Sequence, residues 1–210
     1  LIIGFGLDLA NITPIIKKIA TASFVFASGG WAILALAFSY WLIDVKGKFE
    51  KGAKPFIIVM TYGMTNEIKF GGLRNFDIKP FQSVLVDELI PYVDANFRTV
   101  ANQENRAMAG LSMGGFETRL ITLNRPDVFS YYALFSGGIF KPEEIKNHGK
   151  LKLIFESCGS KERPDGVKSS VDELKAAGIN AVSYISEGTA HEFHTWRRSL
   201  HQLAQLLFKE

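Results

Sequence analysis

The chain has 210 residues, a formal net charge of +3, 47% apolar residues and 21% charged residues, values typical of one globular domain with a sizeable core. Its lysines and arginines are scattered among acidic residues, so no nucleic-acid-binding surface is predicted. Cys158 is the only cysteine, which excludes an internal disulfide. No cluster of cysteines and histidines has the spacing of zinc ligands, so we expect no metal site and no other cofactor.

The first notable feature along the chain is a run of 24 residues without a charge, at positions 20–43. It is long enough to span a bilayer as a helix and carries Tyr40 and Trp41 near its end. It is too long, and begins too far into the chain, for a cleavable signal peptide. The alternative is a buried helical hairpin that breaks at Gly29 and Gly30. An uncharged segment of this length would expose a large apolar surface to water. We therefore expect residues 20–43 to contact a membrane, the rest of the chain or a second copy in a homodimer.

Residues 11–47 also resemble the last membrane helices of bacterial acyltransferase-type inner-membrane proteins, a family related to the heparan-α-glucosaminide acetyltransferases. The resemblance implies a membrane origin for this segment, and the segment carries no catalytic motif. We therefore expect two parts: an apolar, helical, membrane-like segment at residues 1–49 and a second domain at residues 50–210. The expected location is the bacterial cell envelope or the extracellular space.

From residue 54 onward, apolar runs alternate with helical patterns. Residues 55–60 form a short continuous apolar run, which predicts a strand buried on both faces and near an edge of the sheet. Residues 62–79 contain several glycines and polar residues, as a long loop does. Residues 81–97 have apolar residues at helical spacing, and Pro91 is expected to bend that helix.

The remaining sequence predicts four further strands, each followed by a helix or a loop. The strands are expected at residues 106–111, 131–136, 151–157 and 181–186, and the helices at residues 113–123, 167–178 and 194–209. Gly178 is placed as a helix-terminating glycine. Strands that alternate with helices predict an α/β fold: a mostly parallel sheet of about five strands, with helices on both faces.

The stretch from Gly110 to Gly114 places Ser112 between two glycines, directly after a predicted strand and before a predicted helix. A sharp strand-to-helix turn needs residues without bulk, and a serine at its apex is exposed as a nucleophile must be. The test is whether an acid and a histidine follow later strands, since functional residues gather where parallel strands end. Glu162 and Asp165 follow the strand at 151–157, and His191 and His194 follow the strand at 181–186.

The order serine, acid, histidine is that of the α/β-hydrolases. Two other histidines are less suitable as the base, because His148 precedes a strand and His201 lies well inside the last helix. The backbone N–H of Met113, at the start of the helix after Ser112, is expected to donate to an oxyanion. Such a fold normally has earlier strands and a loop that supplies a second donor. Upstream of residue 55 lies only the apolar segment, so the first strands of the fold are expected to be missing.

Residues 104–138 and 188–208 also resemble the feruloyl and acetyl-xylan esterases of carbohydrate esterase family one, and similar signatures occur near the esterase D group. The resemblance covers roughly residues 54–210. It implies that the base is the histidine of a His-acidic-aromatic-x-x-Trp pattern, which is His191 here, with Trp196 closing the pattern. It also implies that the acid lies four residues after Cys158, at Glu162, although the family commonly has aspartate there. Asp165 stays open as the alternative acid.

The resemblance implies a serine esterase that hydrolyses feruloyl or acetyl esters on plant cell-wall xylan through an acyl-enzyme. Tyr62 and Trp196 are the expected substrate-binding residues, and Phe70 and Phe76 are further aromatic candidates in the same loop as Tyr62. The expected partners are an acylated polysaccharide or a small ester. Two alternatives remain open: a weakly active or non-catalytic relic that serves as a membrane-anchored module, and a hydrolase of another ester or of a thioester.

Overall fold

The computed structural model of the chain describes residues 56–61, 77–145 and 148–209. The elements are, in chain order, α3 (Lys79–Ser83), the π-helical turn η4 (Val84–Leu89), α4 (Ile90–Asn96), the 3-10 turn η5 (Gln103–Asn105), β1 (Ala107–Leu111), α5 (Met113–Asn124), β2 (Tyr131–Phe135), α6 (Pro142–Ile145), β3 (Leu153–Gly159), α7 (Pro164–Ala176), β4 (Ala181–Ser186) and α8 (Phe193–Ala204). The strands expected after residue 100, and the helices between them, are confirmed.

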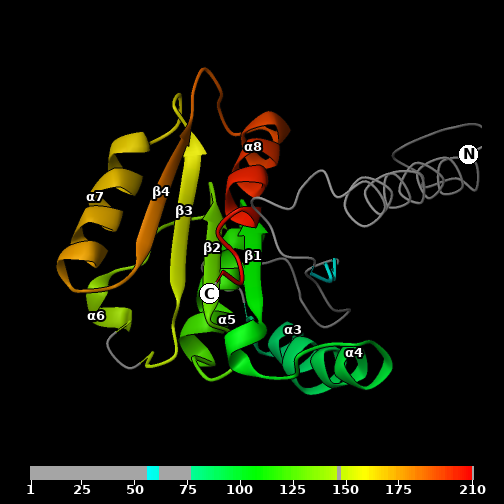
Figure 1. Cartoon of the computed structure of the whole chain (residues 1–210). Helices are drawn as coiled ribbons and strands as arrows, with labels where there is room; N and C mark the ends of the chain where they lie inside the picture. Colours follow the sequence, from blue (N-terminus) through cyan, green and yellow to red (C-terminus); the bar gives the residue numbers. More distant parts are fainter. Residues whose placement is uncertain (1–55, 62–76, 146–147, 210) are drawn as a thin grey trace, which may run out of the picture. The chain divides into compact units, whose positions relative to one another are not determined.

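The strands form one sheet in the order β1-β2-β3-β4, and every neighbouring pair is parallel (Figure 1). Phe135 at the end of β2 lies opposite Leu111 of β1 on one side and Ser157 of β3 on the other. All four carboxyl ends therefore meet at one edge of the sheet. The prediction of a parallel sheet is confirmed, with four strands among the described residues where about five were expected.

Helices cover both faces of the sheet. Side chains of successive residues in a strand point to opposite faces, so each strand contributes to two cores. On one face, Tyr132, Leu134 and Ile154 pack in a core with residues of α3, α5 and α7. On the other face, Phe135 and Phe155 pack with residues of α8 and of the turn that follows it. Strands buried on both faces have near-continuous apolar sequences, and this pattern allowed β2 to be predicted from the sequence.

A helix was predicted at residues 81–97, and the structure has residues 79–96 helical throughout, although the helix is not regular. The π-helical turn η4 occupies Val84–Leu89, just before Pro91. Proline has no N–H to donate and its ring crowds the preceding turn, so the wider turn accommodates it without breaking the segment. At the end of α7, Gly178 has a φ of +80°, the left-handed conformation expected of a helix-terminating glycine.

The strand predicted at residues 55–60 is wrong for the part that the structure describes. Residues 56–61 carry no strand, and Ile57, Ile58 and Met60 are 51%, 62% and 89% exposed. Only Phe56 packs inward, edge-on against Phe208 at 5.8 Å between ring centroids. Apolar composition favours a strand only where a neighbouring strand pairs with it. Within the described residues the free edge of β1 has no such partner.

Several expectations for the first part of the chain lie outside the described residues. They are the apolar segment at residues 20–43, the membrane resemblance of residues 11–47, and Tyr62, Phe70 and Phe76 in the predicted loop. Across the ranges that the structure covers, no helix is long and apolar enough to cross a bilayer. Residues 50–55 of the predicted second domain also lie outside them.

Candidate active site

Ser112 lies at the sharp turn between β1 and α5, in the strand-turn-helix context that the sequence predicted. Its backbone has φ +51° and ψ −116°, a conformation that residues with a side chain rarely adopt. The turn is held by the Ser112 N–H, which donates to the carbonyl of Phe135 on β2 at 2.8 Å. Such local strain persists only where the surroundings enforce it, and here the hydroxyl of the strained residue contacts His191.

The glycines around Ser112 differ in how much space a side chain would have at each position. A Cβ on Gly110 would lie 2.0 Å from the carbonyl oxygen of Gly114, so β1 and the start of α5 touch through this position. A Cβ on Gly115 would lie 2.6 Å from the Cα of Gly137, where α5 meets the loop after β2. A Cβ on Gly114 would meet nothing within 4 Å. Close backbone packing therefore explains Gly110 and Gly115, whereas it does not explain Gly114.

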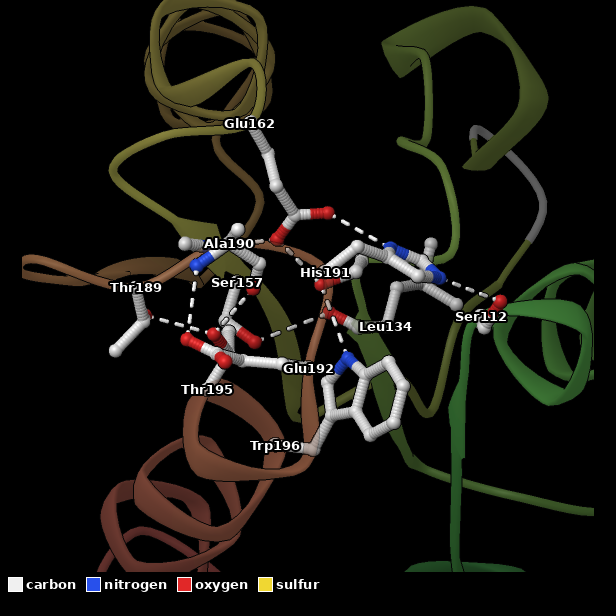
Figure 2. Close-up of polar contacts among 12 residues, drawn as sticks. Ser112, Leu134, Ser157, Glu162, Thr189, Ala190, His191, Glu192, Thr195 and Trp196 are labelled. Atoms are coloured by element: carbon white, nitrogen blue, oxygen red, sulfur yellow. Dashed lines mark hydrogen bonds and ion pairs between the residues drawn. The ribbon is translucent and has the colours of Figure 1, made fainter.

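Three of the predicted site residues meet at the carboxyl edge of the sheet. Ser112 Oγ lies 2.8 Å from His191 Nε2, and His191 Nδ1 lies 2.8 Å from Glu162 Oε1. Figure 2 shows the chain of contacts from Glu162 through the imidazole to Ser112. Because a carboxylate only accepts, Nδ1–H donates to Glu162 and leaves Nε2 to accept from the Ser112 hydroxyl. This tautomer is the one a general base needs.

The carboxylate of Glu162 accepts hydrogen bonds from two groups besides His191. Its Oε2 accepts from the backbone N–H of Gly159 at 2.6 Å and from the hydroxyl of Ser136 at 2.8 Å. Burial alone raises the pKa of Glu162, but the hydrogen bonds from Gly159, His191 and Ser136, together with the attraction to His191, outweigh it and lower that pKa below its ordinary value. The carboxylate is therefore ionised at neutral pH, with its side chain 15% exposed.

The loop that carries His191 is fixed against the end of β3. The carbonyl of Thr189 accepts from Lys161 N–H at 2.9 Å, and a Cβ on Gly159 would lie 2.4 Å from that same oxygen. The Thr195 hydroxyl, at the start of α8, lies 2.7 Å from the Thr189 hydroxyl and 2.5 Å from the carbonyl of Ala190 (Figure 2). The acid loop and the histidine loop thus pack directly on each other.

The other acid and histidine candidates lie elsewhere. Asp165 is in the first turn of α7, and the contact to His191 is made by Glu162. His194 is in the first turn of α8, beside Arg197. His201, near the end of α8, contacts Gln205, the residue that follows this helix. His148 Nδ1 lies 3.0 Å from the hydroxyl of Tyr132.

Met113 is the first residue of α5, where backbone N–H groups have no acceptor within the helix. That position, beside Ser112, is where an oxyanion donor is expected. A cluster of groups that could hold a metal ion does not occur in the described part of the chain.

Trp196 was expected to contact substrate, and the structure gives it two contacts inside the site. Its indole Nε1 donates to Ser136 Oγ at 3.1 Å, and its ring meets the His191 ring edge-on, with centroids 5.2 Å apart. Ser136 was not singled out from the sequence. It lies in a Phe-Ser-Gly-Gly stretch that reads as an ordinary turn, and no local signal marks it. Only the order of the strands brings it to Glu162.

A cavity of about 580 Å³ lies beside the acid, between the loop after β2 and the start of α7. Its lining is mainly apolar and includes Ile139, Cys158 and Val167, with Glu162 and Ser136 on the side of the triad. Cys158 is buried, and burial raises the pKa of its thiol, so it is not an activated nucleophile.

Comparison with known proteins matches residues 48–200 to the esterase family, described as "Putative esterase". The chain is 59% identical over 156 residues to an endo-1,4-beta-xylanase/feruloyl esterase of Xylanibacter ruminicola; the match covers 74% of this chain and 22% of that protein. It is 42% identical over 69 residues to an esterase of Mycobacterium tuberculosis, over 30% of this chain and 14% of the relative. The chain thus spans less than a quarter of the length of these relatives.

Among solved structures, the feruloyl esterase module of Clostridium thermocellum complexed with sinapinate aligns with a TM-score of 0.55 and 19% identity, over 65% of this chain and 60% of that one. A ferulic acid esterase of Anaeromyces mucronatus aligns with a TM-score of 0.51 and 18% identity, over 68% and 60% of the two chains. At these identities the likeness concerns the fold. It agrees with an α/β-hydrolase arrangement of the described strands and helices.

Proposed function

The chain belongs to the esterase family, and from that membership and the geometry of its site we propose that it is a serine esterase acting on feruloyl or acetyl esters of xylan. The observation that carries the proposal is the unbroken chain of hydrogen bonds from Glu162 through His191 to Ser112, with 2.8 Å at each step. The substrate class is supported by the xylanase/feruloyl esterase relative, with its 59% identity over 156 residues.

In the acylation step, Ser112 Oγ attacks the ester carbonyl while His191 Nε2 takes the hydroxyl proton. The imidazolium that forms is stabilised by Glu162, whose lowered pKa keeps it ionised. The carbonyl oxygen becomes an oxyanion and accepts from the N–H of Met113. His191 then gives its proton to the departing alcohol oxygen, which leaves an acyl group on Ser112.

Deacylation repeats these roles with water as the nucleophile. His191 takes a proton from the water, which attacks the acyl carbonyl, and the same proton returns to Ser112 Oγ as the carboxylic acid leaves. The side chain of His191 is 49% exposed, so water reaches the imidazole directly. No cofactor takes part in either step.

The proposal is tested by replacing Ser112 with alanine. The wild-type chain is expected to hydrolyse methyl ferulate or a p-nitrophenyl ester and to be labelled by a fluorophosphonate, whereas Ser112→Ala does neither. Ser199→Ala is the matched control, because it removes a buried hydroxyl in α8 that only donates to the carbonyl of Thr195 within the helix. Equal turnover in the wild type and Ser112→Ala would overturn the proposal.

The substrate class needs its own comparison. Methyl ferulate, acetylated xylan and a short-chain p-nitrophenyl ester separate a feruloyl esterase from an acetyl esterase, and a thioester substrate tests the remaining alternative. Labelling of Ser112 without turnover of any of them would point to an esterase relic that serves as a binding module. The relic is retained as a second candidate because, within the described residues, no strand pairs with the outer edge of β1.

A further inference from the structure

Ser136 is the first residue after β2, and its backbone has a conformation that residues with a side chain rarely adopt. Its φ is +50°, in the left-handed region that favours glycine, and its backbone N–H donates to the carbonyl of Ser157 on β3 at 2.7 Å. The hydroxyl is half-buried and has two partners, Glu162 Oε2 at 2.8 Å and Trp196 Nε1 at 3.1 Å. A serine occupies a position where glycine would be less strained, so the hydroxyl is the feature of this residue to explain.

The direction of both hydrogen bonds follows from the chemistry of the groups. An indole N–H can only donate, so the Ser136 oxygen accepts from Trp196. An ionised carboxylate can only accept, so the single hydroxyl proton of Ser136 points to Glu162. The donation from Trp196 occupies a lone pair of the Ser136 oxygen, and it thereby reinforces the orientation in which the hydroxyl donates to the acid.

The same tryptophan contacts the base. Its ring meets the imidazole of His191 edge-on, at 5.2 Å between centroids and 87° between planes. Trp196 is thus in contact with His191 on one side and, through Ser136, with Glu162 on the other. Ser136 comes from the end of β2 and Trp196 from the first turns of α8, so the two residues tie separate elements of the site together.

We propose that Ser136 and Trp196 are a pair of positioning residues, which hold Glu162 and His191 in the relative orientation that turnover needs. The inference rests on the proposed function, because it assigns these residues a role in the same reaction. Trp196 then acts from within the site, and its indole N–H is committed to Ser136. With Oε2 fixed by Ser136 and Gly159, the carboxylate cannot rotate, and Oε1 stays directed at His191 Nδ1.

The test compares Ser136→Ala, Ser136→Gly, Trp196→Phe and the double variant Ser136→Ala/Trp196→Phe with the control Ser199→Ala. Loss of the hydroxyl is expected to lower kcat by about 10- to 100-fold with KM within about twofold, the range for a hydrogen bond to a charged group. Trp196→Phe keeps an aromatic ring and removes the N–H, and about a tenfold loss is expected from the freed hydroxyl. The double variant should match Ser136→Ala, because the indole N–H acts through that hydroxyl.

Two readouts separate positioning from a structural role. Glycine relieves the left-handed backbone, so Ser136→Gly should have a higher Tm than Ser136→Ala and yet the same loss of kcat. The exchangeable Nδ1 proton of His191 should shift or broaden in the NMR spectrum of both Ser136 variants and stay unchanged in Ser199→Ala. A kcat restored in Ser136→Gly, or strictly additive losses in the double variant, would overturn the inference.

Failure of the inference is distinct from failure of the proposed function. If Ser112→Ala is inactive while all the Ser136 and Trp196 variants turn over like the wild type, the chain is a serine esterase without this positioning pair. If Ser112→Ala is as active as the wild type, the proposed function itself is wrong.

Discussion

Replacement of Glu162 by glutamine is the most informative single change in the site, because it keeps the size of the side chain and removes one acceptor. In the wild type the two carboxylate oxygens accept from three donors: His191 Nδ1–H on Oε1, and Gly159 N–H and the Ser136 hydroxyl on Oε2. Glutamine offers one oxygen and one NH₂ group. The backbone N–H of Gly159 cannot reverse its role, so the amide oxygen is expected to stay on that side.

The NH₂ group of the glutamine then faces His191 Nδ1, which can form a hydrogen bond with it only by accepting. The imidazole must therefore carry its proton on Nε2, where it points at Ser112 and cannot take the hydroxyl proton. A wrong tautomer of this kind costs roughly 10⁴-fold in kcat, as it does in the serine-protease triad from which that figure comes. A factor of 10⁴ corresponds to about 5.5 kcal/mol of transition-state stabilisation at about 1.4 kcal/mol per tenfold.

The measurement is kcat for methyl ferulate or a p-nitrophenyl ester at pH 7 to 8, with Tm followed in parallel. Asp165→Asn is the matched control, because it makes the same acid-to-amide change on α7, away from the contact with His191. We expect Glu162→Gln to lose nearly all turnover with a near-native Tm, and Asp165→Asn to change kcat less than twofold. Retention of more than about a tenth of the wild-type kcat in Glu162→Gln, or a large loss in Asp165→Asn, would refute the tautomer argument.

Three further predictions concern the body of the fold. Gly110→Ala places a Cβ 2.0 Å from the carbonyl oxygen of Gly114, so a loss of more than about 4 kcal/mol and a Tm lower by at least about 8 °C are expected in a thermal melt. Gly114→Ala meets open space within a helix and should raise the unfolding free energy by roughly 0.5 kcal/mol; an equal loss in both variants would contradict the contact analysis. Burial raises the pKa of Glu117 from 4.5 to about 7, so its penalty is absent below about pH 4.5, grows between pH 4.5 and about 7, and stays at about 3 kcal/mol at higher pH. Denaturant unfolding should therefore show that Glu117→Gln is more stable than the wild type at pH 8 and no more stable at pH 4.5, and a gain that is the same at both values would exclude this cause.

Much of the fold was predictable because its two central strands are buried on both faces. β2 has five consecutive buried residues, all apolar, and β3 has seven, of which the first three are apolar, so each appears in the sequence as an apolar run between helical patterns. The order of these runs was enough to place a serine, an acid and a histidine at the ends of three strands. It was not enough to separate Glu162 from Asp165, because that choice depends on where α7 begins. In the structure α7 begins at Pro164, so Glu162 is in the loop and Asp165 is on the helix.

The contacts of Ser136 could not be predicted in the same way. They require that β2 lies between β1 and β3 and that α8 returns to the sheet, facts of topology that no local pattern contains. The same holds for Gly115, whose need for a small side chain comes from Gly137 in another loop. The opposite error occurred in the run at residues 55–60, which predicted a buried strand: the structure assigns no strand to its described part, residues 56–60, and residues 57–60 are exposed.

Within the ranges that the structure describes, the edge of β1 has no neighbouring strand, and this has a limited consequence for the site. Ser112, Ser136, Glu162 and His191 follow β1, β2, β3 and β4 respectively, and the hydrogen bonds that fix them run between these four strands and their loops. Within the described residues, the contacts of the proposed nucleophile, base and acid are therefore made by these four strands and their loops. An oxyanion needs more, because the donor proposed at Met113 is normally joined by a second one from an earlier loop, and the absence of one donor costs about 10²- to 10³-fold in kcat. We therefore expect substitutions at Glu162 or Ser136 to report on the proposed triad, and a second donor to act on the proposed oxyanion site.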